Sequence, residues 1–242
     1  MNTVRTRADS WVPVMRVAAV VVAGCGVVVQ AVLEKTFIPP LAVLDVALVT
    51  GALISRRPGG ERRGRLVMGV ASVVFVLLAV PFDLPHLAHP DSWLPFVTAT
   101  TSVVGALVGV VGLIGMASGG VDRAARAVSA ATVVVVAGAV VVGGLASASA
   151  GSDAAVQGDV AVRAHGIAFQ PTEIGAAAGQ VSVRVDNADL VTHTFAVDGL
   201  GVDVTVPAGK ARRVTFTAQP GTYRFHCTIA GHQNMKGTIV VS

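Results

Sequence analysis

Five long apolar runs fill the first 150 residues of the chain, and they constrain the fold more than any other feature. Valine, alanine and leucine dominate these runs, which cover residues 12–33, 38–55, 66–84, 95–117 and 127–148. Each run approaches the ~20 residues that a helix needs to cross ~30 Å of hydrocarbon. We therefore predict a membrane α-helical bundle of five spans, since backbone groups in lipid must be satisfied within the helix.

The composition supports a membrane protein and excludes two other classes. Hydrophobic residues make up 53% of the chain and charged residues 13%, whereas soluble domains are about a quarter charged. An ordinary soluble enzyme and a disordered chain are both excluded, because disorder needs the opposite balance. Two cysteines, Cys25 and Cys227, are too few for a disulfide-stapled mini-protein.

Basic residues gather at alternate ends of the apolar runs. Residues 1–150 contain 11 Lys and Arg against 7 Asp and Glu, whereas residues 151–242 contain 7 of each. The basic residues that share one predicted side are Arg5, Arg7, Arg16, Arg56, Arg57, Arg62, Arg63, Arg65, Arg123 and Arg126. The positive-inside rule makes this side the cytoplasm. We expect a protein integral to the cytoplasmic membrane, with a cytoplasmic N-terminus, an extracytoplasmic C-terminal domain and no nucleic-acid partner.

The chain divides into a transmembrane region (1–149), a linker (150–158) and an extracytoplasmic domain (159–242). Small and polar residues in the linker predict a flexible tether. A second interpretation stays open. Ala146-Ser147-Ala148 follows an apolar run and mimics a signal-peptide cleavage site, which would release the domain near residue 148.

From about residue 159 the pattern changes to alternation with a period of two. Val181, Val183 and Val185 alternate with polar residues, and Gly, Pro, Asn and Asp separate such runs. Short alternating runs with turn residues between them predict a small antiparallel β-sandwich. About 85 residues allow seven or eight strands.

The most informative segment lies near the C-terminus, where Cys227 is followed by His232 and then by Met235. A further histidine, His193, lies 34 residues upstream of the cysteine on a predicted strand. A thiolate, two imidazoles and a thioether form a soft ligand set, which suits copper in a His₂Cys plane with a weak axial Met. Zinc fits less well, because structural zinc sites rarely recruit methionine.

These residues resemble the cupredoxins, the type 1 blue-copper family that includes azurin, plastocyanin and amicyanin. The resemblance covers about residues 159–242 and extends to Val185-Asp186-Asn187, His193-Thr194-Phe195 and Val206-Pro207-Ala208-Gly209. It implies a Greek-key β-sandwich that holds one type 1 copper. It also implies that His193, Cys227 and His232 are equatorial ligands and that Met235 is the axial ligand. Thr194 stands where many relatives have Asn, and its hydroxyl is expected to brace the ligand loop.

The function that the resemblance implies is electron transfer. We expect a membrane-anchored, non-enzymatic carrier that exchanges electrons with unidentified redox proteins on the outer face. Two alternatives stay open: a copper-handling protein that uses the domain as a metal receptor, and an enzyme subunit whose helices bind a quinone or a haem partner.

Other polar residues have weaker functional interpretations. His226, next to Cys227, is expected to be an exposed strand histidine rather than a second copper ligand. His86 and His89 lie in an outer loop, where copper binding is the less favoured alternative. Asp45 lies inside the second apolar run, where an ionisable side chain is a functional hypothesis by default. We expect Asp45 to be protonated or paired with Gln30.

Overall fold

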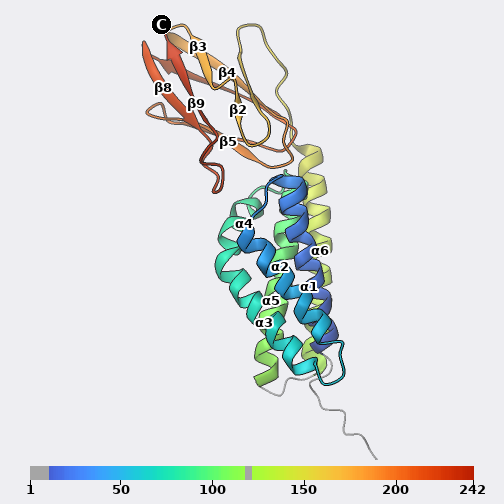
Figure 1. Ribbon diagram of the computed structural model, residues 1–242. Coiled ribbons are helices and arrows are strands. Elements are labelled where there is room, and N and C mark those ends of the chain that lie inside the picture. Colours follow the sequence, from blue (N-terminus) through green and yellow to red (C-terminus); the bar gives the residue numbers. More distant parts are fainter. Residues whose placement is uncertain (1–10, 118–121) are drawn as a thin grey trace, which may run out of the picture. The chain divides into compact units, whose positions relative to one another are not determined.

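The computed structural model describes residues 11–117 and 122–242 and divides into two compact units, each described by itself (Figure 1). The helical unit runs up to Leu87 and resumes over Val97–Val141. The sandwich unit comprises Ala88–Phe96 and Val142–Ser242. Arg5 and Arg7, which were predicted to lie on the cytoplasmic side, fall outside the described residues.

All five apolar runs form helices, as predicted. The helices are α1 (Trp11–Val28), the π-helix η1 (Val29–Leu33), α2 (Pro39–Ile54), α3 (Glu61–Leu78), α4 (Val80–Leu87), α5 (Trp93–Ala117) and α6 (Asp122–Ser149). Two prolines open α2, where a proline costs nothing because the first N–H groups of a helix have no partner within it.

Three or four helical stretches qualify as membrane spans by length and composition. Three helical stretches are long and apolar enough to cross a membrane: Trp11–Leu33, Trp93–Gly115 and Arg123–Ser149. A fourth span arises if α3 and α4, which are bent by 61° at their junction, count as one. Helix α2 has 16 residues, or about 24 Å at 1.5 Å per residue, which is short for a ~30 Å hydrocarbon core. Five spans are therefore not confirmed.

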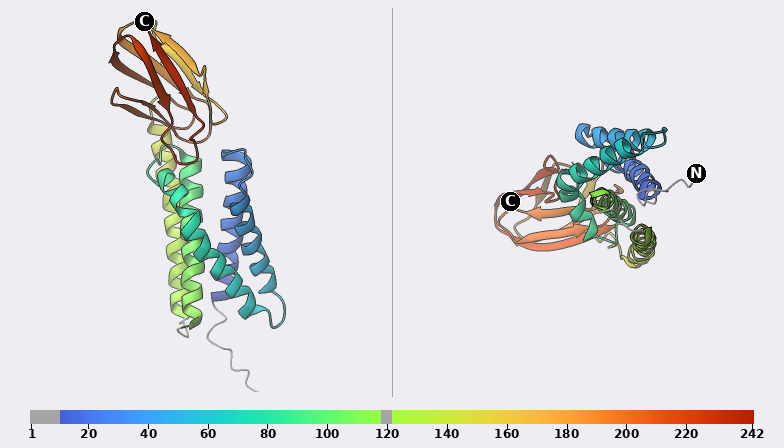
Figure 2. Two further views of the ribbon diagram at one scale, coloured as in Figure 1. Left: turned by 60° about the vertical axis from the view of Figure 1, so that its left-hand side comes forward. Right: turned by 90° about the horizontal axis from the view of Figure 1, so that it is seen from below.

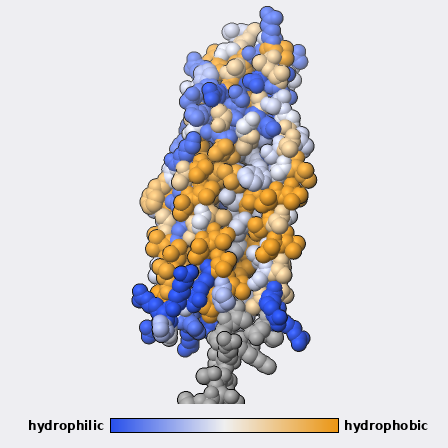
Figure 3. Space-filling model, turned by 90° about the vertical axis from the view of Figure 1, so that its right-hand side faces the viewer, coloured by the Kyte–Doolittle hydropathy of each residue, from blue (hydrophilic) through white to orange (hydrophobic). Residues whose placement is uncertain are grey.

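Apolar side chains that point outward cover much of the helical unit. Val17, Val43, Leu77 and Val134 are all exposed by more than 65%. Figure 3 shows the same feature on one face, where hydrophobic side chains gather over the helices. An apolar exterior of this kind is stable in lipid rather than in water.

Glycines let the helices of this unit approach closely. A Cβ at Gly105 or Gly112 of α5 would overlap Val22 or Met15 of α1, and a Cβ at Gly109 would overlap Ser72 of α3. These three glycines of α5 therefore form a packing surface.

The sandwich unit contains two sheets, which Figure 2 shows from two further directions. Its strands are β1 (Val160–Ala164), β2 (Phe169–Gln170), β3 (Glu173–Ala176), β4 (Gly179–Asn187), β5 (His193–Val197), β6 (Val202–Val206), β7 (Ala211–Ala218), β8 (Gly221–His226) and β9 (Lys236–Val241). One sheet has the order β2-β1-β4-β7 and the other the order β3-β9-β8-β5-β6.

The predicted sandwich is confirmed, but it is not purely antiparallel. Strand β1 pairs with β4, and β3 pairs with β9, in parallel register. The alternation predicted for residues 181–185 is present, because Val181, Val183 and Val185 of β4 are all buried. Their side chains join an aromatic core in which Phe225 lies 5.3 and 5.0 Å from Phe169 and Phe195 between ring centroids.

Part of the segment predicted to be a flexible tether follows the edge of the sandwich. The N–H of Asp153 donates to the Ala211 carbonyl at 3.0 Å, and its carboxylate accepts from the Arg213 N–H at 2.6 Å. The Ser152 hydroxyl accepts from the Ala211 N–H at 2.9 Å. These bonds hold residues 152–153 against strand β7.

Candidate metal centre

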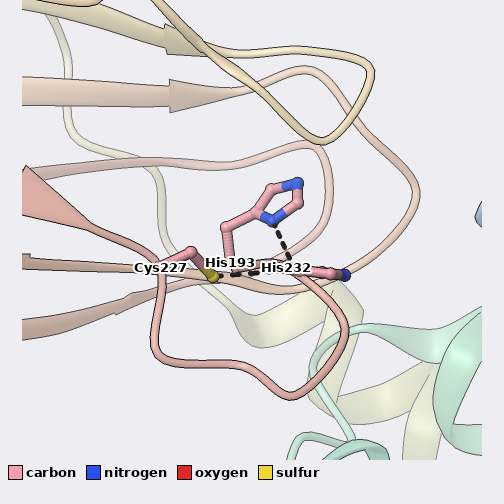
Figure 4. Close-up of side chains that lie close together, drawn as sticks. All are labelled: His193, Cys227 and His232. Carbon is pink, nitrogen blue, oxygen red and sulfur yellow. Dashed lines mark hydrogen bonds between the residues drawn. The ribbon is translucent and has the colours of Figure 1, made fainter. Parts of the chain in front are cut away.

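Three side chains that are far apart in the sequence converge at one end of the sandwich (Figure 4). His193 is the first residue of β5, Cys227 follows the last residue of β8, and His232 lies in the loop that leads to β9. The Nδ1 atoms of the two histidines are 3.2 Å apart, and Cys227 Sγ lies 3.6 Å from His232 Nδ1. All three ligand atoms lie within 4.8 Å of one another.

This spacing fits a single transition-metal ion. Nitrogen and sulfur ligands bind such ions at about 2.0 and 2.3 Å, so neighbouring ligand atoms are about 3 to 4 Å apart. The side chains are also well enclosed, since His193 is 0%, Cys227 4% and His232 2% exposed. Within residues 11–117 and 122–242, this is the group of His, Cys, Asp and Glu side chains that can hold a metal ion.

Asp189 fixes the orientation of the His193 ring. Its Oδ2 atom lies 2.9 Å from His193 Nε2, which turns Nδ1 of the same ring toward Cys227 and His232. A carboxylate in contact with Nε2 favours the tautomer with its proton there, and this leaves the lone pair of Nδ1 for a metal. Carboxylate–histidine pairs of this kind also make the ligand nitrogen more basic.

The Asp189 carboxylate is itself held by the backbone. Its two oxygens accept hydrogen bonds from the N–H groups of Gly166 and Ile167 at 2.8 and 3.0 Å. Although burial raises the pKa of Asp189, these N–H donors and the contact with His193 outweigh burial, so the pKa lies below its usual value. Asp189 was not among the residues predicted from the sequence. The available signal was its position four residues before His193, but only the curvature of the loop turns that spacing into a contact.

The ligand loop is closed by its own backbone. The Cys227 N–H donates to the Met235 carbonyl at 3.0 Å, and the Met235 N–H donates to the His232 carbonyl at 2.8 Å. Gly231 has a φ of +95°, which a residue with a Cβ rarely adopts. Met235 is fully buried at the end of this loop, and its role as axial ligand remains a prediction.

The Cys227 sulfur is surrounded by hydrogen-bond donors. Burial raises the pKa of its thiol, but contacts with the His193 and His232 rings and a hydrogen bond from the Thr194 N–H more than offset burial and lower the pKa to about 5. The Thr194 N–H lies 3.4 Å from Sγ. A thiolate, which is the form that binds metals, is therefore favoured at neutral pH.

Thr194 braces the ligand loop, as expected. Its Oγ1 accepts a hydrogen bond from the Thr228 N–H at 2.7 Å and lies 2.9 Å from the Thr228 hydroxyl. Because Thr228 follows Cys227 directly, this bond ties the start of the loop to strand β5.

The weaker sequence candidates lie outside the cluster. His226 points away from Cys227 on β8, where its Nδ1 atom lies 3.4 Å from the carboxylate of Asp198. His86 and His89 are not part of the metal-ligating group found among the described residues.

A serine from the segment that precedes α5 contacts the residue next to His193. Within the sandwich unit, the Ser92 hydroxyl lies 2.5 Å from the Thr192 hydroxyl and accepts from the Ala208 N–H at 2.9 Å. These bonds fasten the segment at residues 88–96 close to the candidate centre.

Comparison with known proteins identifies the fold of this unit. Residues 134–241 match the family model of the cupredoxin-like domain. Two curated relatives, both cytochrome c oxidase subunit 2 of Thermus thermophilus, are 37% identical over 87 residues. The match covers 34% of this chain and 64% or 51% of the relative, so it spans about half to two thirds of those proteins.

Solved structures that are similar to part of this chain include copper proteins. A Cu(I) form of an amicyanin variant is 20% identical, with a TM-score of 0.31 over 36% of this chain and 86% of amicyanin. A copper-containing nitrite reductase from Thermus scotoductus is 27% identical, with a TM-score of 0.31 over 39% of this chain and 24% of the reductase.

Proposed function

Because residues 134–241 match the family model of the cupredoxin-like domain, we propose that the chain is a membrane-anchored copper protein that transfers electrons on the extracytoplasmic face. The observation that carries the proposal is the convergence of His193 Nδ1, His232 Nδ1 and Cys227 Sγ within 4.8 Å. The similarity to cytochrome c oxidase subunit 2 supports a redox role, and the partners are redox proteins still to be identified.

The donor set fits copper better than zinc. One thiolate and two imidazoles in a plane are the ligands of electron-transfer copper sites, whereas structural zinc sites complete a tetrahedron with further Cys or His ligands. We assign His193, Cys227 and His232 as equatorial ligands and Met235 as the axial ligand of one type 1 copper. When bound, copper supplies a one-electron redox couple.

The protein contributes rigidity. Asp189 holds the His193 ring, Thr194 holds the start of the loop, and the Met235 carbonyl holds the Cys227 backbone. Ligands that cannot move between oxidation states keep the reorganisation on electron transfer small, and the donors around Sγ tune the potential.

The membrane arrangement follows from the helices and the charges. We propose five membrane segments, with the short helix α2 crossing as part of the bundle, and a cytoplasmic N-terminus. The support is the apolar exterior of the helical unit and the placement of arginines at alternate ends of the apolar runs. This arrangement confines the copper domain to a thin layer above the membrane, where its effective concentration for membrane-bound partners is high.

The visible absorption spectrum tests this proposal. The full chain in detergent, loaded with Cu(II), is expected to show an intense thiolate-to-copper band near 600 nm, and Cys227→Ser is expected to abolish it. His226→Ala is the matched control, because His226 neighbours Cys227 but points away from the cluster. A colourless protein that binds only Cu(I) contradicts electron transfer and favours copper delivery.

A further inference from the structure

A cavity in the helical unit lies beside a buried carboxyl group that the copper site does not use. This cavity is a groove open to its surroundings, with a volume of about 580 Å³. It is lined by Val27, Gln30, Ala31, Lys35, Thr36, Phe37, Ala42, Asp45 and Val46. Most of these side chains are apolar, and the volume falls within the range of small-molecule sites, about 300–1,000 Å³.

Asp45 lacks the hydrogen bonds that a buried carboxyl group requires. Its side chain is 7% exposed, and its Oδ1 atom has no hydrogen-bond partner among the described residues. Its Oδ2 atom has one long bond, from Gln30 Nε2 at 3.3 Å. An unsatisfied buried polar group is destabilising, so its presence calls for a missing partner.

Gln30, the neighbour expected to pair with Asp45, uses its other hydrogen-bonding groups on the backbone. Its Oε1 atom accepts from the Ile38 N–H at 3.0 Å, and its Nε2 atom also donates to the Gly26 carbonyl at 3.4 Å. Gln30 therefore connects the loop at 34–38 to the end of α1 and has no further donor for Oδ1 of Asp45.

Two features of the backbone of the first helix lie near the carboxyl group. Helix α1 ends in the π-helix η1, and such turns occur frequently at functional sites. A Cβ at Gly26 would overlap the Asp45 carboxyl group, so glycine at this position makes room for it.

We propose that this cavity binds the ring of a lipid-soluble quinone, with Asp45 as its polar contact. A carboxyl group donates a hydrogen bond when protonated and accepts one when ionised. A quinone carbonyl accepts a hydrogen bond, whereas the hydroxyl of the reduced ring donates one. One carboxyl group therefore matches both redox forms of the ring, and the apolar walls match its membrane-soluble body.

The choice of a redox-active ring rests on the proposed function. An electron-transfer domain tethered to a membrane needs a redox partner, and a quinone is one that diffuses within the membrane itself. The binding site, by contrast, is argued from the helical unit alone, and its test does not require copper.

Equilibrium binding to the metal-free full chain tests the proposal. The chain is placed in phosphatidylcholine nanodiscs with a tritium-labelled benzoquinone that carries a decyl tail, and empty nanodiscs give the partitioning background. We expect saturable binding of one quinone per chain. Asp45→Leu is expected to weaken binding by about tenfold or more, as for other lost hydrogen bonds to a charged group.

Two further variants separate loss of the site from loss of the fold. Ala31→Trp fills the cavity from an exposed position and leaves Asp45 in place, so it is expected to abolish binding. Asp83→Asn is the matched control, because Asp83 also has a buried oxygen without a partner but does not line this cavity. It is expected to bind like the wild type.

Three outcomes overturn the proposal: no saturable binding, binding that neither Asp45→Leu nor Ala31→Trp reduces, or displacement by decanol as effective as displacement by unlabelled quinone. The last outcome identifies the occupant as an acyl chain. Because the chain is metal-free, a negative copper spectrum and a negative binding result are independent, and each refutes only its own proposal.

Discussion

Asp189 and Asp45 are buried to nearly the same extent, at 6% and 7% exposure, but the two halves of the molecule treat them differently. Asp189 in the sandwich accepts hydrogen bonds from two backbone N–H groups and contacts His193. Asp45 in the helical unit has one long bond from Gln30, and its Oδ1 atom has no partner among the described residues.

The difference follows from where each half has free backbone donors. A helix uses nearly all of its N–H groups internally, so a carboxyl group between helices depends on other side chains or on a ligand. The loops at the end of a sandwich leave N–H groups available, and Gly166 and Ile167 donate two of them to Asp189. The protein therefore supplies hydrogen bonds to both oxygens of Asp189 but to only one oxygen of Asp45 among the described residues.

The two halves also pack differently, because the sandwich has a buried aromatic core whereas the helical unit exposes large apolar side chains. The largest loss of stability is expected when that aromatic core is truncated. Phe225 is fully buried between Phe169 and Phe195, so Phe225→Ala is expected to destabilise the sandwich by about 3–5 kcal/mol. Hydrogen exchange of β8 and β9 amides in the full chain, followed by mass spectrometry, measures this loss. Phe82→Ala is the control, because Phe82 is 59% exposed in the helical unit. An equal effect of both variants would contradict the aromatic core.

Replacement of each buried carboxyl group by an amide tests the difference in hydrogen bonding between Asp189 and Asp45 directly. Asp189→Asn places an N–H₂ group against N–H donors and is expected to cost about 2–3 kcal/mol. Asp45→Asn disturbs a carboxyl group that has only one long hydrogen bond. Its stability is therefore expected to stay within about 1 kcal/mol of the wild type. Thermal midpoints of the full chain in detergent measure both. Similar losses for the two variants would show that Asp45 is as well satisfied as Asp189.

A smaller loss of stability is expected when the hydrogen bond between Thr194 and the start of the ligand loop is removed. Thr194→Val keeps the shape of the side chain but removes the acceptor of the Thr228 N–H, at an expected cost of about 1 kcal/mol. Exchange of the Thr228 amide is expected to accelerate, whereas Thr205→Val on the neighbouring strand β6 is expected to leave it unchanged. Unchanged exchange in Thr194→Val would argue against the brace.

The smallest effect is a pH dependence at the edge of the sandwich. Arg213 donates to both oxygens of Asp159 at 2.8 and 2.7 Å, and with Ser182 and the Val156 N–H it holds the pKa of that carboxyl well below its usual range. A lowered native pKa contributes stability above the unfolded pKa, about 3.9, and this contribution is lost as the pH falls through the native pKa. The difference in thermal midpoint between wild type and Asp159→Asn is therefore expected to be constant above about pH 5 and to shrink below about pH 4.

Asp198→Asn serves as the control for this titration. Asp198 is 53% exposed and lies 3.4 Å from His226. Its substitution is expected to change the acid dependence little, because an exposed pair contributes little stability. A profile for Asp159→Asn that runs parallel to the wild type at every pH would contradict the role of Arg213.

Local patterns were enough to predict most of the elements. The apolar runs indicated the helices, and the alternation at Val181, Val183 and Val185 indicated the longest strand. Pairing was harder to predict: the parallel pairs of β1 with β4 and β3 with β9 join segments that alternation alone cannot match. The second apolar run, residues 38–55, predicted the bounds of α2 (Pro39–Ile54) to within one residue at each end, but not whether so short a helix crosses the membrane.

The same distinction between local pattern and tertiary packing applies to the candidate metal site. The sequence by itself determined that Cys227, His232 and Met235 share one short segment after a predicted strand, because only eight positions separate the first from the last. Only the tertiary structure decided that His193 reaches them and that Asp189 orients it, since both depend on how β5 and its preceding loop pack. It also decided that Asp45 lies beside a cavity with an oxygen unpaired, because that outcome depends on helices whose contacts no local pattern encodes.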